Sequence, residues 1–277
     1  MLDTATIPRF SQPATRFEDV YRRRHVTWLR RGWGLLATLL ALLLLWQLVA
    51  WAVRSQVLPG PAEVMRTLYH ALLTGGLGEH LAISAYRVVV SIVIAVAVAL
   101  PLGLAFGYSP SLYRLSSPVV YLAYPIPKIV LLPVLLMFLG VGDSSKVAML
   151  VLILVFQIFI VVRDAARAVP PALVHSVSSL GARRLALLRY VFLPATLPSL
   201  LTALRISMGT AIAVLFFVES FGTSAGLGFY ILVEGWGRLA YEEMYAGVVA
   251  MALLGMALYF ILDVLERRVC RWVWVGK

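Results

Sequence analysis

Six long apolar segments constrain the fold of this chain more than any other feature of its sequence. A helix that crosses about 30 Å of hydrocarbon needs about 20 predominantly apolar residues, at a rise of about 1.5 Å per residue. The segments lie at about 33–53, 82–106, 117–140, 145–163, 196–218 and 244–265. Hydrophobic residues make up 61% of the chain, which is outside the range of ordinary soluble domains. The mean hydropathy of +0.91 agrees, and the sequence predicts an all-α membrane protein with six transmembrane helices.

The first apolar segment could be mistaken for a signal peptide, because AWA at 50–52 resembles a cleavage site. A signal peptide has a shorter apolar core, of about 7–15 residues. The long polar stretch that precedes this segment also favours an uncleaved helix. We therefore expect a polar N-terminal leader at 1–32, a transmembrane domain at 33–268 and a C-terminal tail at 269–277.

The basic residues predict the orientation of the helices. Seventeen of the 24 Lys and Arg residues lie before the first segment, in the connections on that same side, or in the C-terminal tail. Cytoplasmic loops carry an excess of Lys and Arg, so both termini should be cytoplasmic. These residues flank apolar runs and do not form a face with interleaved aromatics. The formal charge of +11 therefore indicates membrane topology and contact with membrane lipids, and not nucleic-acid binding.

The connection between the fourth and fifth segments contains HSVSSLGARRLALLRYVFLP at 175–194, which is too short of apolar residues to cross a membrane. Pro170 and Pro171 should end the preceding helix, and Pro194 suits the first turn of the next one. Between them, Leu173–Leu180 predicts a short helix that ends at Gly181, because glycine tolerates the left-handed conformation. A short surface helix held at both ends by transmembrane helices can transmit force to them.

This stretch resembles the cytoplasmic loop of the permease subunits of binding-protein-dependent ABC importers. The family pattern is EAA, three residues, Gly, nine residues, Ile, any residue and Leu-Pro. The last four positions are occupied by Gly181, Val191, Leu193 and Pro194. Residues 175–177, His-Ser-Val, replace EAA. The family's glutamate often helps to anchor the loop to the ATPase, and His175 cannot make the same carboxylate contact.

Other stretches resemble the nitrate, sulfonate and taurine type of importer permease, in the same order along the chain. They are LPGPAEVMRTL at 58–68, HLAISAYRVVVSIVIAVAVALPLGLAFGYS at 80–109, PIPKIVLLPVLLMFLGVGDSSKV at 125–147 and GLGFYI at 226–231. The resemblance covers about residues 33–268. It implies the type I ABC importer permease fold, in a bacterial cytoplasmic (inner) membrane, with a cytoplasmic coupling helix between spans four and five.

The resemblance also implies the function and the partners. The chain would be a permease homodimer that forms the pathway for a small solute, such as a sulfonate, nitrate or a similar organic or inorganic anion. Cytoplasmic ATPase subunits would dock at the 171–194 loop, and a periplasmic or lipid-anchored solute-binding protein would deliver the solute. The implied coupling residues are Leu173, His175, Ser176, Ser179, Gly181, Ala182, Arg183, Arg184, Leu193 and Pro194. The alternative is an ordinary basic loop that only sets topology.

Prolines interrupt the third apolar segment at Pro118, Pro125, Pro127 and Pro133. Carbonyls freed at such a break must be satisfied by neighbouring groups or by water in a cavity. Two alternatives therefore stay open: a broken helix that lines the pathway, or a bend near the membrane interface at Pro125 and Pro127.

Charged residues within or beside the spans are further pathway or gate candidates. Lys128 and Arg205 could attract an anionic solute, although structural pairing or extension toward the cytoplasmic boundary is the favoured alternative. Glu219, at the outer end of the fifth segment, could belong to a gate or a docking surface, or could form hydrogen bonds at a helix end.

Several function classes lack sequence support. The sequence has no G-x-x-x-x-G-K-[ST] motif, so we expect no ATPase activity in this chain, no cofactor of its own, and ATP-Mg on the partner subunit. His70 and His80 lack the supporting ligands of a metal pair, and the single Cys270 cannot form an intrachain disulfide. Nothing indicates an enzyme. The remaining alternatives are a secondary transporter, which would need carboxylates in the spans, and a non-transporting membrane scaffold.

Overall fold

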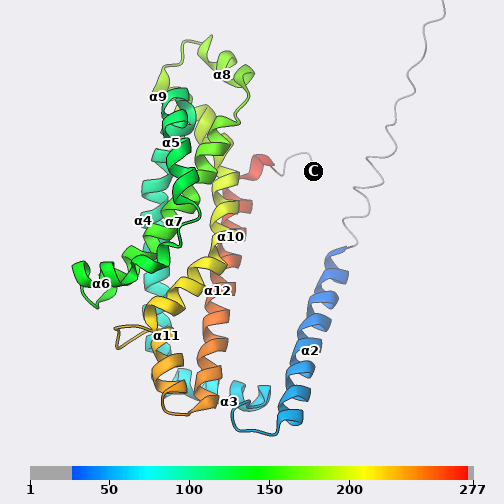
Figure 1. Ribbon diagram of the computed structural model, residues 1–277. Helices are drawn as coiled ribbons and strands as arrows, with labels where there is room; N and C mark the ends of the chain where they lie inside the picture. The colour runs from blue at the N-terminus through cyan, green and yellow to red at the C-terminus, as the bar shows by residue number, and fades with distance from the viewer. Residues whose placement is uncertain (1–26, 274–277) are drawn as a thin grey trace, which may run out of the picture. The chain divides into compact units, whose positions relative to one another are not determined.

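The computed structural model describes residues 27–273, and every regular element within that range is a helix (Figure 1). The predicted all-α class is therefore confirmed. The predicted leader at 1–32 falls mostly on residues 1–26, outside the described range, as does the tail from residue 274. Helix α2 (Thr27–Val53) belongs to one compact unit, and residues 55–275 form the other.

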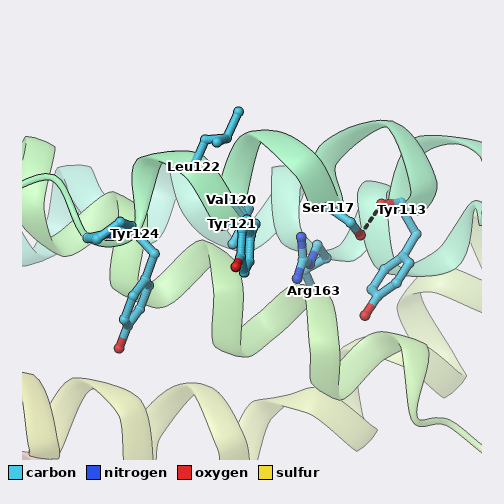
Figure 2. A pocket seen from close by; sticks show the side chains of 8 residues that line it. Tyr113, Ser117, Val120, Tyr121, Leu122, Tyr124 and Arg163 are labelled. Atoms are coloured by element: carbon cyan, nitrogen blue, oxygen red, sulfur yellow. Dashed lines mark hydrogen bonds between the residues drawn. The ribbon is translucent and has the colours of Figure 1, made fainter.

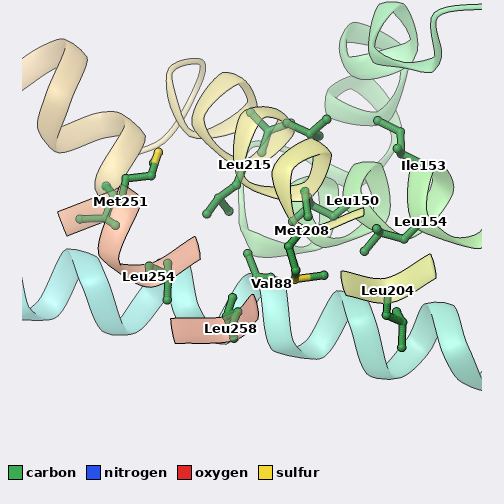
Figure 3. Close-up of a cluster of buried hydrophobic side chains, with 14 of the residues drawn as sticks. Val88, Leu150, Ile153, Leu154, Leu204, Met208, Leu215, Met251, Leu254 and Leu258 are labelled. Atoms are coloured by element: carbon green, nitrogen blue, oxygen red, sulfur yellow. The ribbon is translucent and has the colours of Figure 1, made fainter. Parts of the chain in front are cut away.

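Four long helices form the core of the second unit. They are α4 (Leu77–Tyr108), α7 (Asp143–Arg167), α10 (Leu193–Glu219) and α12 (Tyr241–Val269). Leu150 and Leu154 of α7 are buried together with Met208 and Leu215 of α10 (Figure 3). These helices are apolar on most of their surface, as expected of helices that contact one another on one side and lipid on the other.

Two glycines bring α4 and α7 into close contact. A Cβ atom added to Gly103 would lie 2.8 Å from the Cβ of Val162, and one added to Gly107 would meet the backbone oxygen of Arg163 and the side chain of Ala166. Small residues at a helix interface allow the two backbones to approach closely. The C-terminal half of α7 is thereby held against α4.

Within residues 27–273, five helices are long and apolar enough to cross a membrane, and they match five of the six predicted segments. Their spans are Leu36–Val53, Leu77–Tyr108, Asp143–Arg167, Arg184–Glu219 and Tyr241–Val269. A sixth span exists only if a bent helix pair is counted as one.

The bent pair replaces the single helix predicted at 117–140. Helix α5 (Pro110–Ala123) is followed by the 3-10 turn η1 (Lys128–Leu131) and by α6 (Leu132–Leu139). The two parts meet at 82°. Pro125 and Pro127 explain the break, because proline donates no backbone hydrogen bond and disfavours helical geometry in the residue before it.

Short elements occupy the two ends of the bundle (Figure 1). At the end where α4 and α7 begin are α3 (Pro61–Leu73), α11 (Leu227–Phe229) and the π-helix η3 (Tyr230–Trp236). At the other end are α8 (Pro171–Ser178), α9 (Arg184–Leu187), the π-helix η2 (Leu188–Phe192) and η4 (Arg271–Val273). We call these the α11 end and the α8 end.

Candidate functional site

Helix α8 is the short helix that the sequence predicts between the fourth and fifth spans. It covers Pro171–Ser178, two residues earlier than expected at each end. Gly181 follows with a φ of 81°, in the left-handed region that the turn was expected to require. A Cβ at Gly181 would meet nothing within 4 Å. The glycine is therefore required by backbone conformation and not by close packing within the chain.

The α8 loop has an anchored face and an exposed face. Val174 and Val177 pack against a small apolar cluster at the α8 end. The cluster consists of Ala166, Leu187, Val191 and Phe192. On the other face, Leu173 is exposed, as is Leu180 with 84% of its surface. Because α7, α9 and η2 supply the cluster, the anchored face of α8 packs against all three elements.

The predicted coupling residues divide between these two faces. The exposed ones are Leu173, His175, Ser176, Ser179, Gly181, Arg183 and Arg184. Ala182 is partly buried against the apolar cluster. Leu193 and Pro194 are partly buried in the first turn of α10, where the missing N–H of proline is harmless. Only the first group is available to a partner on this side.

Lys128 lies at the break between α5 and α6. Its Nζ atom donates to the carbonyl oxygens of Ala123 (3.1 Å) and Ile126 (3.4 Å), so it satisfies carbonyls freed by the break. It also lies 3.8 Å from the ring centroid of Phe156. Phe156 is in the middle of α7, so Lys128 is paired locally and does not extend to the α8 end.

Pro133 is the second residue of α6, where its missing N–H leaves no hydrogen bond unmade.

A hollow of about 620 Å³ extends along α5 from this break toward the α8 end. Its polar lining consists of Tyr113, Ser117, Tyr121, Tyr124 and Arg163. Figure 2 shows Tyr113 and Tyr124 extending to the same side of α5, with Arg163 of α7 between them. Pro125 lines the hollow where α5 is broken. Of the predicted pathway prolines, only Pro125 lines it.

Arg163 is a buried cation that sequence reasoning counted only as a topology signal. Its Nε atom donates to Asp164 Oδ1 (2.9 Å), its Nη2 atom forms an ion pair with the same oxygen (2.8 Å), and Nη1 donates to the Ser116 hydroxyl (3.2 Å). Its guanidinium also lies 4.7 Å from the ring centroid of Tyr113. A cation–π contact of this kind stabilises the charge where water is scarce.

Arg205 is paired inside the bundle. Its Nη1 atom lies 2.7 Å from an Asp263 oxygen and 3.2 Å from a Glu266 oxygen, both on α12. The structural pairing alternative therefore accounts for this charge, and Arg205 does not line the hollow.

Glu219 is fully buried at the α11 end. Arg87 Nη1 donates to Glu219 Oε1 (2.7 Å), the Ser84 hydroxyl donates to the same carboxylate (2.8 Å), and the Gly228 N–H donates to Oε2 (2.9 Å). Glu219 is the last residue of α10, and its carboxylate binds the glycine-rich segment that follows the helix. In this conformation Glu219 therefore forms hydrogen bonds at a helix end, which is one of the two roles considered for it.

The Glu219 carboxylate is part of a larger ionic network. Arg87 also donates to Asp143 at the start of α7, with distances of 2.8 and 2.6 Å, and to the Ala225 carbonyl (2.9 Å). The network therefore joins α4, α7, α10 and the glycine-rich segment. Gly226 is enclosed by it: its φ is +116°, and a Cβ there would lie 2.5 Å from the Glu219 carboxyl carbon.

Sequence reasoning missed this network, although a signal was available. Ser84, Arg87 and Ser91 are three and four residues apart inside an apolar run, so they lie on one face of α4. All three are buried. A polar face within an apolar helix indicates a buried polar partner.

Among residues 27–273, no group of three or more His, Cys, Asp and Glu side chains could hold a metal ion.

Cys270 is fully buried. Burial raises the pKa of its thiol, and the nearby Glu266 carboxylate raises the pKa further. The reactive thiolate is therefore scarce near neutral pH.

Comparison with known proteins gives consistent matches. The family model described as binding-protein-dependent transport system inner membrane component matches residues 92–274. The chain is 30% identical over 245 residues to the taurine transport system permease protein TauC of Escherichia coli (strain K12), covering 86% of this chain and 88% of the relative. It is 27% identical, over 95% of both chains, to a Bacillus subtilis (strain 168) protein named as an aliphatic sulfonates transport permease, SsuC.

The fold is similar to that of the MetNI methionine ABC transporter in its inward facing conformations. The TM-score is 0.60 at 22% sequence identity, and the match covers 71% of this chain and 97% of the other. This likeness confirms the predicted type I importer permease fold.

Proposed function

Because this chain belongs to the binding-protein-dependent transport system inner membrane component family, we propose that two copies of it form the solute pathway of an ATP-driven importer. A single copy, with five or six spans in its described part, encloses little space for a pathway. Two copies facing each other would enclose more. A periplasmic or lipid-anchored binding protein would deliver the solute at the α11 end.

The α8 loop would dock a cytoplasmic ATPase subunit. Two observations support this role: the exposed face of α8 and the attachment of its other face to α7 and η2. ATP-Mg would bind to the ATPase subunit, and ATP binding would draw the two ATPases together. The α8 loops would then move the attached helices between inward-open and outward-open states.

The distribution of charge supports an α8 end in the cytoplasm, with both termini on that side. The α8 end carries Arg114, Arg163, Arg167, Arg183, Arg184, Arg189, Arg267, Arg268 and Arg271. The α11 end carries Arg66, Arg87, Lys146 and Arg238. Cytoplasmic connections are the ones enriched in Arg and Lys.

The solute we propose is a small anion, and a sulfonate in the first place. The names of the E. coli and B. subtilis relatives, taurine and aliphatic sulfonates, support this class. Nitrate and other small organic anions are the alternatives within it.

The observation that carries the proposal is the family match together with an α8 loop that is anchored on one face and exposed on the other.

We expect the C-terminally tagged chain, gently solubilised from its own host, to co-purify with an ATP-binding subunit in about equal amount. Mass spectrometry identifies the subunit, and an unrelated tagged membrane protein from the same host is the control. Repeated recovery of the intact chain without an ATPase would overturn the importer assignment and favour a membrane scaffold.

A further inference from the structure

The hollow along α5 is lined by a stripe of hydroxyl groups. Tyr113, Ser117, Tyr121 and Tyr124 follow one another at spacings of four, four and three residues, so they share one face of the helix. Tyr121 is 81% exposed and Tyr124 is 70% exposed. Within the described chain, the three phenol hydroxyls have no hydrogen-bond partner. The hydrocarbon of a bilayer cannot satisfy such groups, so within the bilayer core this face requires water or a polar ligand.

Positive charge predominates around the hollow. Arg163 lines it, and Arg167 lies 5.5 Å from the ring centroid of Tyr113. At the other end, Lys128 lies over Phe156, whose ring centroid is 6.5 Å from that of Tyr124. Among the described residues, the one carboxylate in contact with these cations is Asp164, which is half exposed. Three cations against one carboxylate favour an anionic ligand.

Arg163 retains donors for such a ligand. A guanidinium has five N–H groups; one donates to Asp164, one donates to Ser116, and the Nη2 atom is paired with the Asp164 carboxylate. One N–H on each terminal nitrogen is therefore left. Terminal guanidinium N–H groups match the oxygens of a carboxylate or a sulfonate well.

We propose that this hollow is a subsite for a small organic anion on the solute pathway, an inference that rests on the proposed function. The anionic oxygens would accept hydrogen bonds from Arg163 and from the tyrosine hydroxyls. The short carbon chain of the solute would contact Val120 and the tyrosine rings, which also line the hollow. The transported solute would occupy this subsite with its anionic group at the Arg163 side of the hollow.

Accessibility of an introduced thiol tests the subsite in the intact importer. Cys270 is the single cysteine, so Cys270→Ala provides a thiol-free background. Tyr121→Cys places a thiol on the stripe, whereas Val119→Cys places one on α5 outside the lining of the hollow, at a position that is also exposed. The probe is 2-sulfonatoethyl methanethiosulfonate, itself a small sulfonate. We expect Tyr121→Cys to react roughly tenfold faster than Val119→Cys, because thiolates form only where water has access.

Solute protection is the second measurement. During turnover with ATP and the binding protein, a transported anion should slow the labelling of Tyr121→Cys severalfold and leave Val119→Cys unchanged. Taurine, ethanesulfonate and nitrate are the solutes to compare. If one of them is transported but does not slow labelling, the subsite is wrong and the proposed function stands. If none is transported while the ATPase still co-purifies, the anion assignment fails and the subsite fails with it.

Removal of the hydroxyls alone provides a check that preserves the rings. We expect Tyr121→Phe combined with Tyr124→Phe to reduce taurine uptake roughly tenfold to hundredfold, with ATPase association unchanged, because hydrogen bonds to charged groups are the stronger ones. Tyr190→Phe, at an exposed position of η2 outside the hollow, is the matched control. Uptake equal to that of the control would overturn the subsite.

Discussion

Replacing Glu219 by leucine is expected to lower the thermal midpoint of the solubilised protein by on the order of 10 °C. Of the carboxylates that the structure describes, the change leaves only Asp143 paired with the buried Arg87 guanidinium, and it removes the acceptor of the Gly228 N–H. Breaking a buried ion pair from one side costs about 3–5 kcal/mol, and each kcal/mol corresponds to about 2–4 °C in a chain of this size. Size-exclusion chromatography after heating measures the midpoint.

The double variant Arg87→Leu with Glu219→Leu separates charge from packing. It should lose less stability than the sum of the two single variants, because neither Arg87 nor Glu219 is left as a buried charge without the other. Asp143 is half exposed and can be hydrated. Glu79→Leu is the matched control, since Glu79 is an exposed carboxylate in the first turn of the helix that carries Arg87. A Glu219→Leu midpoint equal to that of the control would contradict a stabilising role for the network.

The membrane helices could be predicted because the required apolar length is a local property of the sequence. The break in the third span was partly predictable, since Pro125 and Pro127 announce an interruption but do not give its angle. The 82° bend depends on how α6 packs against α7 and on Lys128, which satisfies the carbonyls of Ala123 and Ile126. These contacts are tertiary, and no spacing in the sequence encodes them.

The candidate sites show the same division. Helix α8 was predictable because prolines and Gly181 are local signals of helix ends and turns. The Glu219 network was not predictable, because its charged members are far apart in the sequence. Asp143 lies 56 residues from Arg87, and Glu219 lies 132 residues from it. Likewise, the sequence left open whether Lys128 pairs locally or extends toward the cytoplasmic boundary, and it did not indicate Phe156 of α7 as the aromatic ring beside its Nζ atom. A charge in an apolar run indicates that a partner exists but not which residue it is.

Replacing Gly181 by valine is expected to weaken ATPase association roughly tenfold while membrane insertion stays intact. A left-handed backbone costs a non-glycine residue about 1–2 kcal/mol, and about 1.4 kcal/mol corresponds to tenfold in affinity. The turn at φ 81° would relax toward a different conformation and displace the exposed face of α8. Because a Cβ at this position meets nothing within 4 Å, the new side chain does not itself disturb the bundle. Quantitative pull-down of the ATPase and taurine uptake in proteoliposomes measure the effect.

Gly76→Val is the matched control for this experiment. Gly76 has a φ of 78°, and a Cβ there also meets nothing within 4 Å, so the backbone strain is nearly the same. It lies between α3 and α4, at the end of the bundle opposite α8. Gly181→Asn should retain most of the association, because asparagine tolerates the left-handed conformation better than valine does. If Gly181→Val and Gly76→Val bind the ATPase equally well, the α8 turn does not position a docking surface, and the coupling role assigned to it is wrong.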